Sequence, residues 1–173
     1  MSETWSTRHA LDRLNSASAA EATQRLRACN GSRGWTRAMV AGRPYPDVRT
    51  LLATAERESR ALSWTEVLAA LATHPRIGES PDGQGAEAEW SRREQAAMGG
   101  ADAELRRAVL EGNRAYEKRF GHVFLIRAAG REGPEMLAAL RSRLANDEAT
   151  ERAVVTDQLA QITRLRVERL LTE

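Results

Sequence analysis

The 173-residue chain has little of several residue types, and each scarcity excludes a class of structure. Cys29 is the only cysteine, so neither an internal disulfide nor a cysteine-based metal cluster can form. Aromatic residues make up 5% of the chain, and the four tryptophans are scattered rather than spaced as a stacking platform for bases. No stretch approaches the ~18 apolar residues of a membrane span, and no N-terminal apolar run has signal-peptide length. We expect a cytoplasmic protein with no membrane partner and no nucleic-acid partner.

The chain also has no large excess of positive or negative charge. Lys and Arg number 26 against 24 Asp and Glu, a formal net charge of +2, and both signs are interspersed along the chain. All basic residues except Lys118 are arginine, a bias that more often reflects genome composition than a binding surface. With 42% hydrophobic and 29% charged residues, the composition is that of an ordinary globular protein. The length predicts one domain over residues 1–173.

Helix start signals recur along the chain. Ser18–Glu21 and Ser63–Glu66 are capping-box patterns, and Ser32, Asp47 and Asp102 are placed as N-caps. Glycines and prolines mark the ends of the apolar periodic segments. The expected helices cover about residues 19–28, 33–41, 48–62, 64–73, 87–98, 103–120, 133–145 and from 148 to near the C-terminal end.

Two segments lack helix signals. Glu79–Ala86 holds two glycines and a proline, which predicts a surface loop. Val123–Ala128 is apolar and β-branched, but it stands alone, so we expect an extended connector rather than a strand. The predicted fold class is therefore all-α, a single-domain bundle of about eight helices.

The motif His74-Pro75-Arg76-Ile77-Gly78 carries the clearest chemical signal. Pro75 disfavours helical geometry at the preceding residue, so His74 should lie just past a helix end. Imidazole has an unperturbed pKa of about 6.5 and can both accept and donate a proton near neutral pH. A lone histidine is often a surface or capping residue, but a loop carried on a rigid scaffold favours a catalytic role.

The next helix places polar side chains along one seam. Ser91, Glu94 and Gln95 are spaced i, i+3 and i+4, so they share a helical face that is separate from the apolar face of Trp90 and Ala97. The alternative is an ordinary solvated face. We hypothesise that Glu94 and the imidazole before it form an acid/base pair at a pocket rim.

Arg166 is expected to be buried. It follows Leu159 by seven residues and Ile162 by four, so the helix turns it toward the same apolar stripe. A buried guanidinium needs an anionic or multiply accepting partner. That partner is either a buried carboxylate of the protein or a carboxylate or ureido oxygen of a substrate.

Other chemistries are excluded by the residues present. The chain has no His-x-x-x-His or His-Glu pair for zinc, no phosphate-binding glycine loop and no Gly-x-Ser-x-Gly elbow. His9 and His122 lack a catalytic context and are interpreted as structural. Asn113, Tyr116 and Phe120 recur at helical spacing, which is typical of core and capping positions.

Taken in order, these motifs resemble those of the OHCU decarboxylases, which act on 2-oxo-4-hydroxy-4-carboxy-5-ureidoimidazoline in purine catabolism. The matching residues are Cys29-Asn30-Gly31-Ser32 with Trp35, Arg43-Pro44, His74 to Gly78, Ser91-x-x-Glu94-Gln95, Asn113-x-x-Tyr116-x-x-Arg119-Phe120-Gly121, Phe124-Leu125-Ile126, Leu140-x-x-Arg143-Leu144-x-Asn146 and Ile162 to Arg166. Each motif alone is weak, but the ordered set is specific. The correspondence places the core of the domain at about residues 10–171.

The resemblance implies an all-α, cofactor-free and usually homodimeric enzyme with no metal. His74 would be the catalytic imidazole, Glu94 its acidic partner and Arg166 the polar anchor. The substrate would be lined by Pro75, Ser91, Arg92, Arg93, Glu94 and Gln95, and by the backbone of Phe124, Leu125, Ile126, Arg127 and Ala128. Glu79 and Arg127 depart from the family pattern, which commonly has Asp or Gly and a smaller residue there.

The implied reaction yields (S)-allantoin. The carboxylate leaves a carbon next to a C=N group that accepts the electrons, so orientation, water exclusion and proton handling suffice. Association with the preceding pathway enzyme, hydroxyisourate hydrolase, is a further hypothesis that the sequence leaves open. Two alternatives stay open on the residues alone: a helical interaction or regulatory module, and a helical enzyme acting on another ureido or oxo acid.

Overall fold

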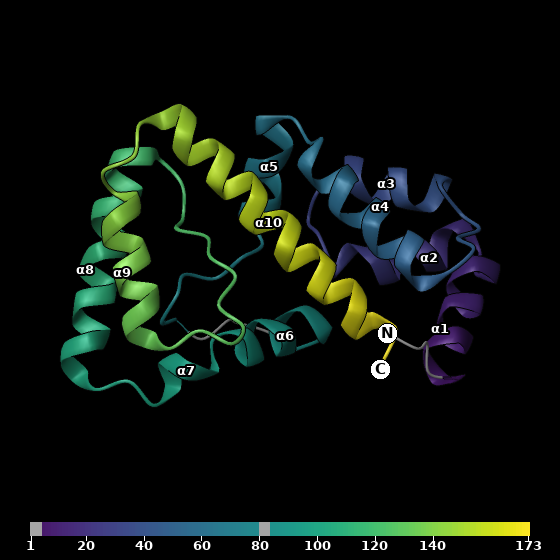
Figure 1. The fold of residues 1–173 in the computed structure, drawn as a ribbon, viewed down its shortest axis with the longest axis horizontal. Coiled ribbons are helices and arrows are strands. Elements are labelled where there is room, and N and C mark those ends of the chain that lie inside the picture. Colours follow the sequence, from purple (N-terminus) through teal and green to yellow (C-terminus); the bar gives the residue numbers. More distant parts are fainter. Residues whose placement is uncertain (1–4, 80–83) are drawn as a thin grey trace. The chain divides into compact units, whose positions relative to one another are not determined.

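The computed structural model describes residues 5–79 and 84–173, and all regular elements within these ranges are helices (Figure 1). The ten described helices are α1 (Trp5–Ser16), α2 (Ala19–Arg27), α3 (Arg33–Ala41), α4 (Val48–Arg60), α5 (Trp64–Leu71), α6 (Ala86–Glu94), α7 (Ala96–Gly99), α8 (Ala103–Phe120), α9 (Gly133–Arg143) and α10 (Glu148–Leu170). The predicted all-α fold class is confirmed. Within the same ranges, no helix is both long and apolar enough to cross a bilayer.

Most helices begin at the predicted capping residues. The side chain of Ser18 accepts a hydrogen bond from the backbone N–H of Glu21. The carboxylate of Glu21 accepts one from the backbone N–H of Ser18, which completes the predicted capping box of α2. Asp47 accepts from the N–H of Thr50 at 2.7 Å, and Asp102 caps α8 in the same way. These side chains satisfy N–H groups that have no partner within the helix.

Two features of the helices differ from the prediction. α1 is not predicted, because only Ala10, Leu11 and Leu14 of its twelve residues are buried and give an apolar signal. The helix expected over about 87–98 is instead two helices, α6 and α7, separated at Gln95. The side chain of Gln95 accepts a hydrogen bond from the backbone N–H of Gly78 at 2.9 Å, a tertiary contact that helical periodicity does not reveal.

The chain divides into two compact units, one up to Ala70 together with Leu159–Glu173 and the other Leu71–Gln158. We call them unit 1 and unit 2; the single-domain organisation stays a prediction. In unit 1, the indole N–H of Trp35 donates to the carbonyl of Ala55 at 3.0 Å, which joins α3 to α4. The expected loop at 79–86 includes residues 80–83, which lie outside the described residues.

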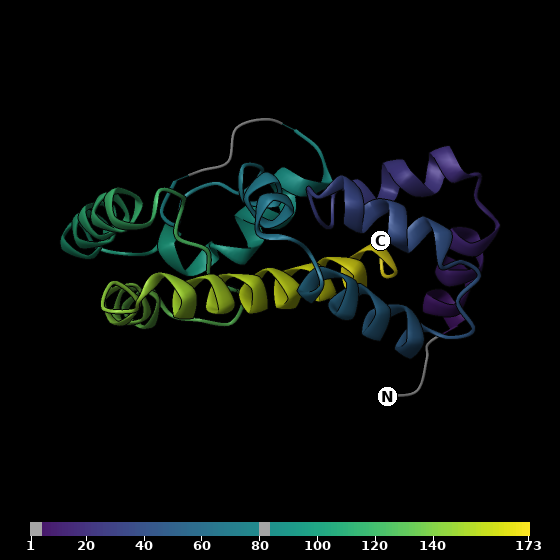
Figure 2. The same ribbon diagram turned by 90° about the horizontal axis from the view of Figure 1, so that it is seen from above.

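Unit 2 has a core built around α8 and α9, which lie side by side (Figures 1 and 2). The segment Val123–Ala128 joins them without regular structure, as predicted for an extended connector. Its apolar side chains enter the core, so the connector is an internal part of the unit. The buried members of this core are Ile77, Met98, Val109, Tyr116, Phe124, Ile126, Ala128, Met136 and Leu140.

Candidate active site

His74 lies just past the end of α5, as the Pro75 signal predicts. The helix ends at Leu71, and the backbone N–H of His74 donates to the Leu71 carbonyl at 3.0 Å in a closing turn. The side chain of His74 is buried, with 9% of the residue exposed. The imidazole is therefore held in the protein interior rather than on a solvated loop tip.

The loop that carries His74 is fixed at two successive residues by other elements. The carbonyl of Ile77 accepts a hydrogen bond from the side-chain amide of Asn113 on α8, at 2.9 Å. The N–H of Gly78 donates to Gln95, which separates α6 from α7, also at 2.9 Å. These contacts tie the loop both to α8 and to the end of α6.

The polar seam of α6 is not a solvated face. Ser91 and Glu94 are 3% and 8% exposed, and the carboxylate of Glu94 is therefore buried on the same element that contacts the His74 loop through Gln95. Arg92 and Arg93 are exposed. The guanidinium of Arg93 forms an ion pair with Glu89 on the solvent side.

The connector offers polar backbone groups inside the core. The carbonyl of Leu125 accepts from the guanidinium of Arg143 at 2.7 Å, and the N–H of Arg127 donates to Gln158 at 2.8 Å. Ile126, between them, is 4% exposed, and its N–H and C=O have no hydrogen-bond partner among the described residues. Buried backbone groups are nearly always paired, so Ile126 presents a donor and an acceptor suited to a polar ligand.

A buried ion pair holds this connector in place. Glu151 is fully buried and accepts hydrogen bonds from Arg143, from the hydroxyl of Tyr116 and from the amide of Asn146. The Arg143 guanidinium also lies 4.5 Å from the ring centre of Phe124. Burial of the hydroxyl raises the pKa of Tyr116 above its ordinary value, and the hydrogen bond to Glu151 raises it further. Arg143 belongs to one of the sequence motifs, whereas no sequence pattern points to Glu151.

Arg166 lies in unit 1 and is 1% exposed, as its spacing from Leu159 and Ile162 predicts. Its guanidinium donates to the backbone carbonyl of Ala28 at 3.4 Å. Burial of a cation at this position is thus part of the fold of unit 1. Its action on the same ligand as His74 and Glu94 stays a prediction.

The other histidines have structural surroundings. His9 is exposed and packs edge-on against Trp5, with ring centres 4.0 Å apart. Nδ1 of His122 lies 3.0 Å from the carbonyl of the next residue, Val123. In the described ranges, no three His, Cys, Asp or Glu side chains gather as a metal site would require.

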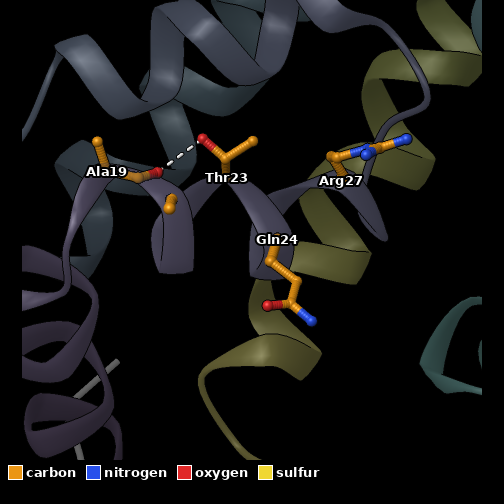
Figure 3. A pocket seen from close by; sticks show the side chains of 5 residues that line it. Ala19, Thr23, Gln24 and Arg27 are labelled. Carbon is orange, nitrogen blue, oxygen red and sulfur yellow. Dashed lines mark hydrogen bonds between the residues drawn. The ribbon is translucent and has the colours of Figure 1, made fainter.

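Two open hollows lie on unit 1, and none of the predicted site residues lines either of them. The first is lined by Ala19, Ala20, Thr23, Gln24 and Arg27 of α2 (Figure 3). The Thr23 hydroxyl donates to the Ala19 carbonyl at 2.7 Å within the helix. The second runs along α3 and shares Thr23 and Arg27. Neither hollow contains a histidine or a carboxylate, so neither provides a proton-transfer group.

The model of the OHCU decarboxylase family matches residues 15–168. The chain belongs to this family. The resemblance seen in the ordered motifs is confirmed by this match, which includes His74, the polar seam of α6, the connector and Arg166. The family assignment covers residues of both units.

A solved structure of an OHCU decarboxylase in the presence of (S)-allantoin is 28% identical, with a TM-score of 0.72, over 85% of this chain and 96% of that one. An (S)-allantoin synthase structure is 19% identical, with a TM-score of 0.67, over 94% of this chain and 53% of that one, and supports the fold alone. The uric acid degradation bifunctional protein TTL of Arabidopsis thaliana is 28% identical over 149 residues, 84% of this chain. The alignment covers 46% of that relative, so the chain spans about half its length.

Proposed function

We propose that this chain is a decarboxylase that converts 2-oxo-4-hydroxy-4-carboxy-5-ureidoimidazoline to (S)-allantoin in urate degradation. The observation that supports the proposal is that unit 2 buries an imidazole and a carboxylate, two groups able to transfer a proton. His74 and Glu94 are both buried, and the hydrogen bond between Gly78 and Gln95 joins the elements that carry them. The substrate is inferred from family membership, because the positions of His74 and Glu94 alone do not specify it.

The chemistry needs few groups from the protein. When the bond to the carboxylate breaks, carbon dioxide leaves and the electron pair passes to the adjacent C=N group, whose nitrogen takes a proton. The 4-hydroxyl then loses its proton as the ring carbonyl forms, and the neighbouring carbon that bears the ureido group gains one. The protein must orient the carboxylate, exclude water and move these protons.

Most of the predicted residues have a place in this scheme. His74, oriented by Glu94, takes the proton of the 4-hydroxyl. Arg166 anchors the substrate carboxylate. The unpaired N–H and C=O of Ile126 bind the ureido group, and the remaining contacts come from Pro75, Ser91, Gln95, Phe124, Leu125, Arg127 and Ala128.

Two partners are part of the proposal. We infer a homodimer from the family resemblance. We also infer association with hydroxyisourate hydrolase, because the product of that enzyme is this unstable substrate and direct transfer would limit its spontaneous decay. The Arabidopsis relative, whose name describes a bifunctional protein of uric acid degradation, supports the idea of such coupling.

The test is turnover of substrate generated freshly from urate. His74→Asn should lower the rate on the order of 10²–10⁴-fold, with the thermal unfolding midpoint close to that of the wild type. His9→Asn is the matched control, because it makes the same change at an exposed histidine and should leave the rate unchanged. Near-native turnover by His74→Asn would remove His74 from the mechanism, and an inactive wild type would reject the decarboxylase assignment.

A further inference from the structure

Asn113 lies on the inward stripe of α8. It falls four residues after Val109 and three before Tyr116, both of which belong to the core of unit 2, and it is 2% exposed. The same core contains Ile77 of the His74 loop and Ile126 of the connector. Asn113 therefore lies among the segments that the proposed function uses, although its spacing alone predicts only a core or capping role.

The amide of Asn113 has one defined orientation. Nδ2 donates to the carbonyl of Ile77 at 2.9 Å, and a flipped amide would place two oxygens against each other. The next residue of the loop, Gly78, donates its N–H to Gln95 at 2.9 Å. Two successive loop residues are thus held by side chains from different elements, three and four residues after His74.

Packing alone does not explain why an asparagine occupies position 113, because of the state of its side-chain oxygen. Oδ1 of Asn113 is buried and has no hydrogen-bond partner among the described residues. Leucine has a similar shape and would fill the space without burying an unpaired oxygen. A buried acceptor left without a donor is unfavourable, and such groups call for a specific reason in a native structure.

We propose that Asn113 is a positioning residue for the decarboxylase site. The hydrogen bond from Nδ2 fixes the Ile77 carbonyl. Asn113 and Gln95 together keep the loop in the conformation that presents His74 to the substrate. Asn113 acts through the loop and does not itself transfer a proton. This inference rests on the proposed function for its catalytic consequence, but the clamp on the loop is a separate physical claim.

The test compares Asn113→Leu with Arg114→Leu. The control introduces the same side chain at the next residue of α8, which is exposed. Both variants are measured for thermal unfolding, for amide hydrogen exchange in peptides covering residues 75–79, and for kcat and KM. We expect Asn113→Leu to exchange at least about tenfold faster in the loop but not in α8. We expect its kcat to fall about tenfold or more, with KM changed less than about threefold, because a displaced reacting group lowers the rate of the chemical step.

Each other outcome has a defined meaning. Unchanged exchange overturns the clamp, and a lower kcat with unchanged exchange would instead assign Asn113 a direct contact with substrate. Faster exchange with native kcat overturns the link to His74. If Asn113→Leu does not fold, Asn113→Ser removes the amide with a smaller side chain and takes its place. An inactive wild-type enzyme would reject the proposed function, while the exchange measurement would still decide whether Asn113 holds the loop.

Discussion

At the scale of single residues, the described part of unit 2 contains two buried carboxylates, Glu94 and Glu151, in different surroundings. Glu151 is surrounded by donors from Arg143, Tyr116 and Asn146, so its charge is compensated within the fold. Glu94 lies on the polar seam of α6 beside buried Ser91. Glu151 is therefore structural, and Glu94 is the carboxylate that we propose for the chemistry.

Substitutions of Glu94 should separate orientation from proton transfer. If the carboxylate mainly orients the imidazole, Glu94→Gln keeps a hydrogen-bonding group of the same shape and should lose less activity than Glu94→Ala. We expect Glu94→Ala to lose on the order of 10²-fold in kcat and Glu94→Gln to retain several-fold more. Steady-state kinetics at matched folded fraction measures both. Equal losses would show that Glu94 itself moves a proton.

Removal of Glu151 should destabilise the protein. Glu151→Gln leaves the Arg143 guanidinium buried beside a neutral amide, and breaking a buried pair on one side costs about 3–5 kcal/mol. The control is Glu148→Gln on the same helix, which removes an exposed pair with Arg152 and should cost less than about 1 kcal/mol. Urea unfolding of the two variants measures the difference. Similar small losses would mean that the buried network does not hold the connector.

At the scale of elements, α8 is defined at both ends by single residues. Asp102 caps its first turn, and Gly121 ends it in the left-handed conformation with φ of 78°. The connector then begins two residues later. The direction in which the chain leaves α8 therefore depends on a backbone conformation that L side chains rarely adopt.

Substitution at this glycine should cost stability through the backbone alone. A Cβ at Gly121 would meet nothing within 4 Å, so Gly121→Ala introduces no clash and should lose roughly 1–2 kcal/mol from the left-handed conformation. Gly99, at the end of α7, also has open space but an ordinary negative φ. Gly99→Ala should change stability by less than about 0.5 kcal/mol. Equal effects in denaturant unfolding would contradict this account of the α8 end.

The start of a helix is predictable where the capping side chain and the N–H that it binds are close in the sequence. Ser18, Asp47 and Asp102 bond to N–H groups three residues later, and such pairs are visible in the sequence. The break at Gln95 is not predictable from local pattern, and the bond that its side chain accepts comes from Gly78, seventeen residues earlier. α1 is not predictable from the sequence, because its apolar signal is short.

At the scale of the whole molecule, the candidate site could be predicted in part. Helical spacing correctly predicted the burial of Arg166, whereas residue type and loop position make His74 a candidate whose role stays a prediction. The partners of Glu151 and the bond from Asn113 to Ile77 join residues distant in sequence, so no local pattern reveals them. The family match over residues 15–168 covers all of the dispersed motifs, which lie in both compact parts of the chain.

The most direct test of the central claim follows the stereochemistry of the product. Urate is oxidised and hydrolysed to the ureidoimidazoline in a cuvette, the protein is added, and circular dichroism records optically active allantoin. Spontaneous decay gives a racemate and no lasting signal, whereas the proposed enzyme should produce the signal of (S)-allantoin at a rate proportional to its concentration. Allantoin formed at the uncatalysed rate, without optical activity, would contradict the account.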